Sequence, residues 1–284
     1  MHSVSGDRAN RPDYTIESRV LVACDKGRYH TLMDITMPAS FPETEFRAFG
    51  IAASNFFPGL LSDEVPYDPQ EKRRHFDWSW QAVRYRYRSC AECSEEFKVL
   101  LDNPSEMWQA GWGDEELTYK LERCIYVFFM GALSVFDSFA LSLYYLSNAI
   151  QPAAFPDVAA PRKITRTTTH KAMSAAFPQD AITGLLGSLP QDARFANIDA
   201  IRNLLAHRIS GRRSVRSSGT LQKDGTYTTD FHEETWHIPG ATGKLVFDRE
   251  LLQRHLDDIT ALLSSLAAAA RSFAEAHQPT KAGP

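Results

Sequence analysis

The chain has 284 residues, of which 43% are hydrophobic and 23% are charged, a balance typical of a globular protein. Its formal net charge of −4 argues against a protein that coats nucleic acid without sequence preference, so any contact with RNA requires a local basic patch. Four cysteines in no regular framework and a polar start without an apolar segment lead us to expect a cytoplasmic protein.

The first 68 residues combine strand and turn signals with many prolines. The stretch from Tyr14 to Thr36 surrounds the turn Asp25-Lys-Gly27 and predicts a β-hairpin. Five prolines between positions 38 and 69 predict a loop-rich connection with one short helix, Glu43–Ser54. We therefore expect residues 1–68 to be an N-terminal loop and hairpin embellishment of a helical domain.

Two long helices are predicted next, because apolar residues recur every three or four positions over Gln70–Leu101 and over Asp114–Ile150. The second contains an uncharged run, Cys124–Phe136, but Asp137 and several serines interrupt it before the roughly 20 residues of a membrane span. We expect a buried helix of a bundle and no membrane contact. A buried carboxylate at Asp137 needs a partner, either an arginine of the Asp199–Arg208 segment or a neighbouring hydroxyl.

The first long helix carries two further patterns. Arg84-Tyr-Arg-Tyr-Arg88 alternates with a period of two, so a short strand is the competing interpretation. Arginines interleaved with tyrosines could bind RNA bases and phosphates, but on a helix the tyrosines split between faces and the arginines are solvated. Cys90-Ala-Glu-Cys93 lacks the second pair of ligands that a zinc site needs, so we expect no metal or redox role there.

The segment after the second long helix begins with a linker rich in Pro and Ala, residues 152–161. Arg162–Lys171 then concentrates basic residues around a run of threonines, and is either a phosphate contact or a solvated helix start. A broken helical pattern follows over Ala172–Leu189, and a further helix is predicted over Asp192–Ile209.

This further helix has two unlike faces along Asp199–Arg208. An apolar stripe consists of Ile198, Ile201 and Leu205. The polar positions on the other side are Asp199, Arg202, Asn203 and His207. Asn203 and His207 are four residues apart and are therefore neighbours on the helix surface. A histidine near a helix C-terminus also interacts favourably with the helix dipole, so the functional hypothesis depends on the combination of a cation, an amide and an imidazole on one face.

The run Arg202-Asn203-Leu-Leu-Ala-His207 resembles the Arg-Asn-three-residues-His signature of HEPN domains. These are all-α domains, and many of them are metal-independent ribonucleases in toxin and antiviral systems. Judged by the order of the helices, the resemblance covers about the last two-thirds of the chain. Its specific part is the six residues of the motif. It implies a mainly α fold, an antiparallel HEPN-like helical bundle with small β-hairpin insertions, over residues 69–277.

The motif is followed by a basic segment and then by a segment with strand and turn signals. Ser210–Arg216 predicts a flexible basic loop beside His207, which either captures RNA or is a charged surface loop. The candidate phosphate-binding arginines are Arg208, Arg212, Arg213 and Arg216. A β-hairpin insertion is predicted near 217–247, then a last helix to about Ala276, and a disordered tail over 278–284. The residues of the last helix that we interpret as surface residues are Arg249, His255, Arg271 and His277.

The resemblance also implies roles for the motif residues. His207 would act as general base or acid when a ribose 2′-OH attacks the adjacent phosphate, which leaves a 2′,3′-cyclic phosphate and a 5′-OH. Arg202 would stabilise the charge of the phosphorane, and Asn203 would orient the histidine or the phosphate. Asp199 could tune the imidazole through a hydrogen bond, with Asp137 as a second supporting residue.

The partners expected from the same resemblance are RNA, a second copy of the chain that completes the site in a symmetric homodimer, and a cognate antitoxin or sensor protein. These residue types require neither a metal nor another cofactor. The alternative is a non-catalytic HEPN-like module that binds nucleotides or partner proteins, in which Arg202 and His207 are structural or ligand-binding.

Overall fold

The computed structural model describes residues 36–57, 69–102, 114–156, 161–206, 212–223, 227–240 and 243–278, and over these ranges the chain is mainly helical. The expected N-terminal hairpin falls on residues 14–36 and, except for its last residue, lies outside the described residues, as does the end of the expected tail, 279–284.

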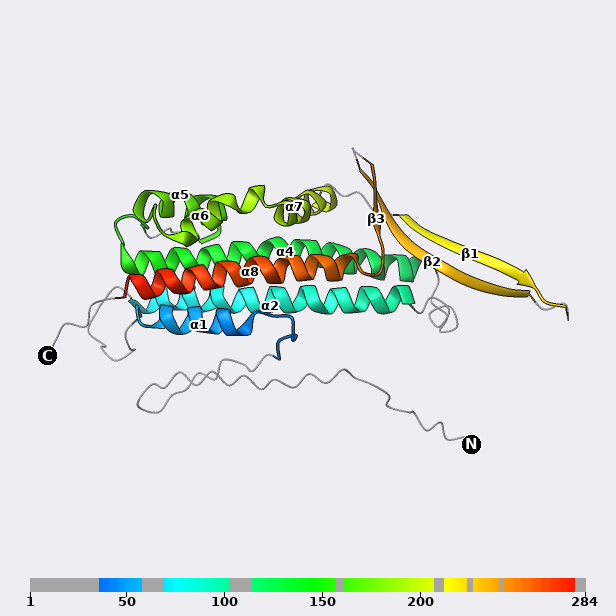
Figure 1. Cartoon of the computed structure of the whole chain (residues 1–284), viewed down its shortest axis with the longest axis horizontal. Helices are drawn as coiled ribbons and strands as arrows, with labels where there is room; N and C mark the ends of the chain where they lie inside the picture. The colour runs from blue at the N-terminus through cyan, green and yellow to red at the C-terminus, as the bar shows by residue number, and fades with distance from the viewer. Residues whose placement is uncertain are drawn as a thin grey trace, which may run out of the picture.

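Four helices form an elongated bundle, and the three longest run side by side along it (Figure 1). They are α1 (Glu43–Ser54), α2 (Pro69–Asp102), α4 (Asp114–Ile150) and α8 (Leu251–Ala276). The sequence predicted the first three to within one residue at each end, the two long ones from their periodicity, and these predictions are confirmed. The helices α2 and α4 pack against each other along most of their length, whereas α8 contacts α1, α2 and α4.

A second layer of short helices covers α4 and α8 (Figure 1). It consists of η1 (Pro161–Lys163), α5 (Arg166–Ala176), α6 (Ala181–Ser188), η2 (Leu189–Gln191) and α7 (Ala193–Ala206). The helical pattern that the sequence shows as broken is therefore two helices, and α7 holds the candidate motif. Of this layer, α5 and α7 pack on α4, while α6 and α7 pack on α8.

A three-stranded antiparallel sheet in the order β1-β2-β3 projects from the end of the bundle where α2 ends and α8 begins (Figure 1). Its strands are β1 (Arg212–Leu221), β2 (Tyr227–Gly240) and β3 (Gly243–Phe247). In the register of β1 and β2, Arg212 lies opposite His237, and a shift follows between Arg216 and Ser217. The segment expected as a flexible basic loop is thus strand backbone from Arg212 onwards, because pairing with β2 supplies its hydrogen bonds.

The central helix of the core is α4. Its buried side includes Phe128, Phe129, Phe136 and Phe139, all nearly inaccessible to solvent. Among the described ranges, one helical stretch, Glu115–Ile150, has the length and composition of a membrane span, but 61% of its most apolar window is buried inside the bundle. Packing between helices therefore accounts for most of its apolar surface, as in the core helix of a bundle.

The short helix α1 belongs to this same core. Phe46 stacks on Trp80 of α2, with ring centroids 3.4 Å apart, and Phe49 contacts Phe139 of α4 at 5.7 Å. The buried cluster is continuous from Met37 to the last helix. A boundary at residue 68 therefore separates α1 from side chains with which it shares a core, so residues 36–57 are part of the bundle and not an embellishment of it.

Candidate functional site

The helix α7 is anchored by one face and open on the other. Its buried residues are Phe195, Ile198, Ile201 and Leu205. Three of these four form the stripe that the spacing predicted, so the predicted amphipathic helix is confirmed. The helix packs on α4 and α8 through this stripe, which leaves Asp199, Arg202 and Asn203 on the more exposed side.

The described motif residues form a chain of hydrogen bonds on that open side. Arg202 Nη1 donates to Asn203 Oδ1 at 3.0 Å, and Asn203 Nδ2 donates to Asp199 Oδ2 at 3.3 Å. Asn203 is exposed, whereas Arg202 and Asp199 are half-buried. The amide of Asn203 thus links a guanidinium to a carboxylate. Its oxygen accepts from the cation, and its nitrogen donates to the anion.

The other candidate site residues are less fully described. His207 and Arg208 lie outside the described residues, which end in this region at Ala206. Arg212, Arg213 and Arg216 lie in β1, in the first half of the strand. The structure therefore brings Asp199, Arg202 and Asn203 together and gives β1 as the element that carries the three arginines.

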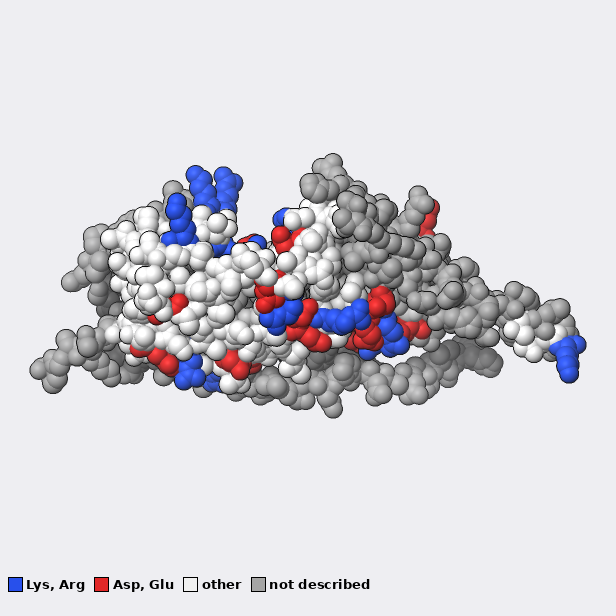
Figure 2. Space-filling view, turned by 45° about the horizontal axis from the view of Figure 1, so that its top comes forward, with Lys and Arg blue, Asp and Glu red and all other residues white. Residues whose placement is uncertain are grey.

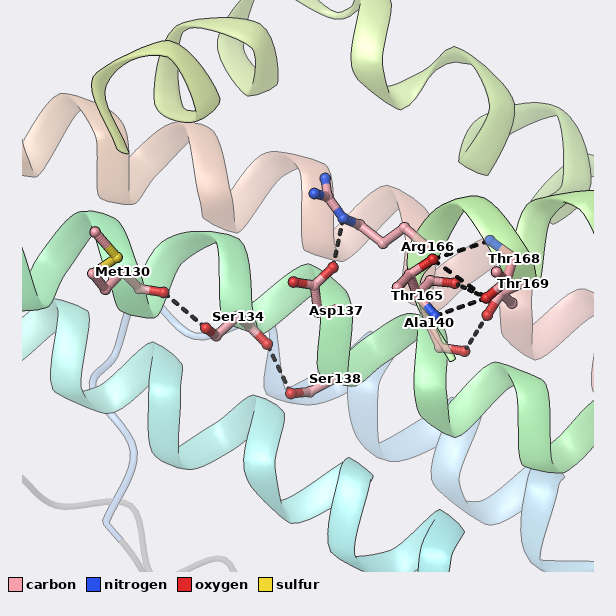
Figure 3. Close-up of polar contacts among 9 residues, drawn as sticks. All are labelled: Met130, Ser134, Asp137, Ser138, Ala140, Thr165, Arg166, Thr168 and Thr169. Carbon is pink, nitrogen blue, oxygen red and sulfur yellow. Dashed lines mark hydrogen bonds and ion pairs between the residues drawn. The ribbon is translucent and has the colours of Figure 1, made fainter. Parts of the chain in front are cut away.

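Asp137 differs from its prediction. Its side chain is 51% exposed and accepts a hydrogen bond from Arg166 Nε at 2.7 Å (Figure 3). It is therefore not a buried carboxylate, and its partner comes from α5 and from neither the motif helix nor a hydroxyl. The expectation was wrong because the uncharged stretch of α4 that precedes Asp137 suggested a buried position, whereas Asp137 lies on the exposed side of the helix.

The guanidinium of Arg166 joins three elements at this point. Besides bonding Asp137 of α4, it lies 4.4 Å from the centre of the Phe195 ring at the start of α7, a cation–π contact. Phe195 in turn meets Phe136 of α4 edge-on at 5.3 Å. Sequence reasoning missed this role, because the basic composition of Arg162–Lys171 marked the residue but no periodic signal connects positions 29 residues apart.

A second arginine lies near Asp137 from the opposite side. Arg86 of α2 donates to Ser138 Oγ, and Ser138 in turn donates to the carbonyl of Ser134 at 2.7 Å. Burial lowers the pKa of Arg86, and the charge of Asp137 opposes that effect. Asp137 therefore balances cations from α2 and α5, and its hydrogen bond goes to Arg166 rather than to the Arg202–Asn203–Asp199 chain of α7.

The thiols and imidazoles of the bundle offer little alternative chemistry. Burial raises the pKa of Cys93 to about 11 and of Cys124 to about 12, so both are weak nucleophiles. His255 is 3% exposed, so its interpretation as a surface residue is wrong. Within the described ranges, no group of three or more His, Cys, Asp or Glu residues is arranged to hold a metal ion.

Comparison of the chain with protein-family models, with curated proteins and with solved structures finds no match. The resemblance to HEPN domains therefore rests on the six motif residues and on the mainly helical architecture.

Proposed function

We propose that the protein is a metal-independent endoribonuclease of the HEPN type, with its site on the open face of α7. The observation that supports this most directly is the chain Arg202–Asn203–Asp199, which holds a guanidinium on an exposed helix face. His207 follows the described end of that helix by one residue and completes the signature. Because the opposite face of α7 is anchored in the core, the guanidinium of Arg202 is positioned before a substrate binds.

In this proposal the 2′-oxygen of a ribose forms a bond to the adjacent phosphorus while the bond from phosphorus to the 5′-oxygen breaks. One imidazole takes the proton of the 2′-OH and a second gives a proton to the 5′-oxygen, each worth roughly 10²–10⁴ in rate. A single His207 cannot easily do both across one bond, so the partner's His207 supplies the second in a symmetric homodimer.

Arg202 stabilises the extra negative charge on the phosphorane. A fixed charge-stabilising donor of this kind is worth roughly 10²–10³ in rate. Asn203 keeps the guanidinium oriented, since its amide oxygen accepts from Arg202 while its nitrogen is held by Asp199. The products are a 2′,3′-cyclic phosphate and a 5′-OH.

The test is the decay of purified total RNA with the wild-type protein, Arg202→Ala and His207→Ala. Arg194→Ala is the matched control, because Arg194 is also an arginine of α7 but is held by Asp192 at 2.7 Å in the first turn. We expect the first two variants to lose activity by about a hundredfold or more and the control to retain it. Equal decay with all four proteins would remove the ribonuclease proposal. Binding of a nucleotide without any decay would favour the non-catalytic HEPN-like module.

A further inference from the structure

The segment from η1 to η2 is strongly cationic on an acidic protein. Residues 161–191 contain four Lys or Arg side chains and a single carboxylate, Asp180, so their net charge is +3 where the whole chain has −4. The cations are Arg162, Lys163, Arg166 and Lys171. We call these four residues the α5 basic patch. Figure 2 shows blue side chains gathered over the end of the bundle that α5 and α6 cover, with almost no red between them.

The exposed cations of this patch differ from most others on the bundle. Arg162, Lys163 and Lys171 are exposed, and none of them forms an ion pair with another residue that the structure describes. Many other cations are neutralised locally, as where Arg88 meets Glu92 at 2.6 Å and Arg271 meets Glu275 at 2.7 Å. Within the described part of the chain, the patch therefore presents positive charge to solvent without a neighbouring carboxylate at three of its four cations.

The placement of the patch opposes the dipole of α5. Three of its cations lie at the N-terminal end of this helix, whose first turn has no acidic residue. The N-terminus of a helix carries a partial positive charge that repels cations and attracts anions. The helix is capped instead by the neutral pair Thr165 and Thr168, which form a capping box. The arrangement is unfavourable in the free protein and becomes favourable when an anion binds, as is typical of positions that serve function.

The patch reaches the start of α7 through Arg166. Arg166 reaches Asp137 with Nε alone, and Figure 3 shows its two terminal nitrogens turned away from that carboxylate. Its guanidinium rests on Phe195 of α7, seven residues before Arg202. At 1.5 Å per residue the two positions are about 10 Å apart along the helix, within reach of a few nucleotides. Both helices lie in the same layer of the fold (Figure 1).

We propose that the α5 basic patch binds the backbone phosphates of a single-stranded RNA that continues across α7 to the candidate site. Several separate cations suit the successive phosphates of a strand better than one compact anion. This proposal rests on the proposed function, from which it takes RNA as the ligand. The binding experiment itself does not depend on cleavage.

The experiment measures binding of a fluorescein-labelled oligouridylate of about a dozen nucleotides by anisotropy over a series of salt concentrations. All proteins carry His207→Ala, so that the RNA stays intact. The patch variant replaces three cations by glutamine: Arg162→Gln, Lys163→Gln and Lys171→Gln. The matched control makes the same change in net charge on paired surface arginines of the other helices: Arg88→Gln, Arg123→Gln and Arg271→Gln.

For single strands the slope of log K against log salt changes by about 0.7 for each phosphate contact. The patch variant should therefore lose about 2 from the slope and bind about ten- to a hundredfold more weakly at 0.1 M salt, whereas the control keeps the slope. Equal slopes for the two variants would overturn the proposal, as would binding to vesicles of phosphatidylserine and phosphatidylcholine through these cations without binding to the RNA.

The two proposals fail in distinguishable ways. If the wild type cuts no RNA but binds it through the patch, the ribonuclease proposal is overturned and the proposal of an RNA-binding surface stands. Cleavage by the wild type with unchanged binding by the patch variant would overturn the binding surface alone.

Discussion

His255 provides a test of the packing of the bundle that is independent of its function. The imidazole is 3% exposed, and its ring meets Phe129 edge-on at 5.2 Å. Both ring nitrogens are buried without a hydrogen-bond partner, and Asp258 Oδ2 lies 3.8 Å from Nδ1, too far for a hydrogen bond. A buried cation here would be costly, so burial, aided by the charge of Arg254, lowers the pKa of His255 from 6.5 to about 4.

This pKa has a defined consequence for stability. The unfolded chain takes up a proton at this residue near pH 6.5, whereas the folded chain does so only near pH 4, so the unfolded state binds more protons between these values. The free energy of unfolding therefore falls as the pH drops from 6.5 to 4. At about 1.4 kcal/mol for each unit of pKa difference, the total loss from His255 is roughly 3 kcal/mol.

The variants His255→Phe and His255→Leu cannot take up this proton. We expect the fall in their free energy of unfolding between pH 6.5 and 4 to be smaller than that of the wild type by roughly 3 kcal/mol. The measurement is urea unfolding followed by far-UV circular dichroism at several pH values. Acidic groups contribute equally to all three proteins, so the difference isolates the histidine. Parallel curves for wild type and variants would refute the inference that this imidazole is buried and neutral.

Two further predictions concern packing. Gly184→Ala should stabilise the fold by about 0.5–1 kcal/mol, because the added Cβ meets nothing within 4 Å. Gly187→Ala in the same helix should gain less, because its Cβ would lie 2.5 Å from His170 Nε2 and that side chain would have to move; equal shifts in melting temperature would contradict this difference. Cys90 and Cys124 are buried, with raised pKa values, so both should resist alkylation at pH 8 until urea is added; rapid labelling of the native protein, measured by peptide mass spectrometry, would show that α2 and α4 pack less closely than described.

The helices could be predicted because their signal is local. The bounds of α2 and α4 agree to within one residue with the periodic segments Gln70–Leu101 and Asp114–Ile150, and the motif helix buries the stripe that its spacing indicated. The prediction that the alternating Arg-Tyr run at Arg84–Arg88 is helical is also confirmed. On α2 its two tyrosines lie on different faces, with Tyr87 buried and Tyr85 exposed. In each case the three- and four-residue spacing of apolar side chains determines which face is buried.

The pairing of distant residues could not be predicted in the same way. The contact between Asp137 and Arg166 depends on how α5 crosses α4, which no local pattern encodes. The strand backbone at Arg212–Arg216 depends on pairing with β2, so its composition alone suggested a loop. His255 is different, because its spacing from Leu252 and Ile259 already placed it on the buried stripe of α8. Its interpretation as a surface residue followed from its polarity and not from its position in the stripe.

The central claim is that the polar face of α7 directs attack by the ribose 2′-OH. The most direct measurement is mass spectrometry of the fragments that the protein produces from a defined RNA in the presence of EDTA, with an all-2′-O-methyl copy of that RNA alongside. We predict fragments with 2′,3′-cyclic phosphate ends from the first RNA, none from the methylated copy, and none from either with Arg202→Ala. Cleavage of the methylated RNA, or the same fragments from Arg202→Ala, would contradict the claim.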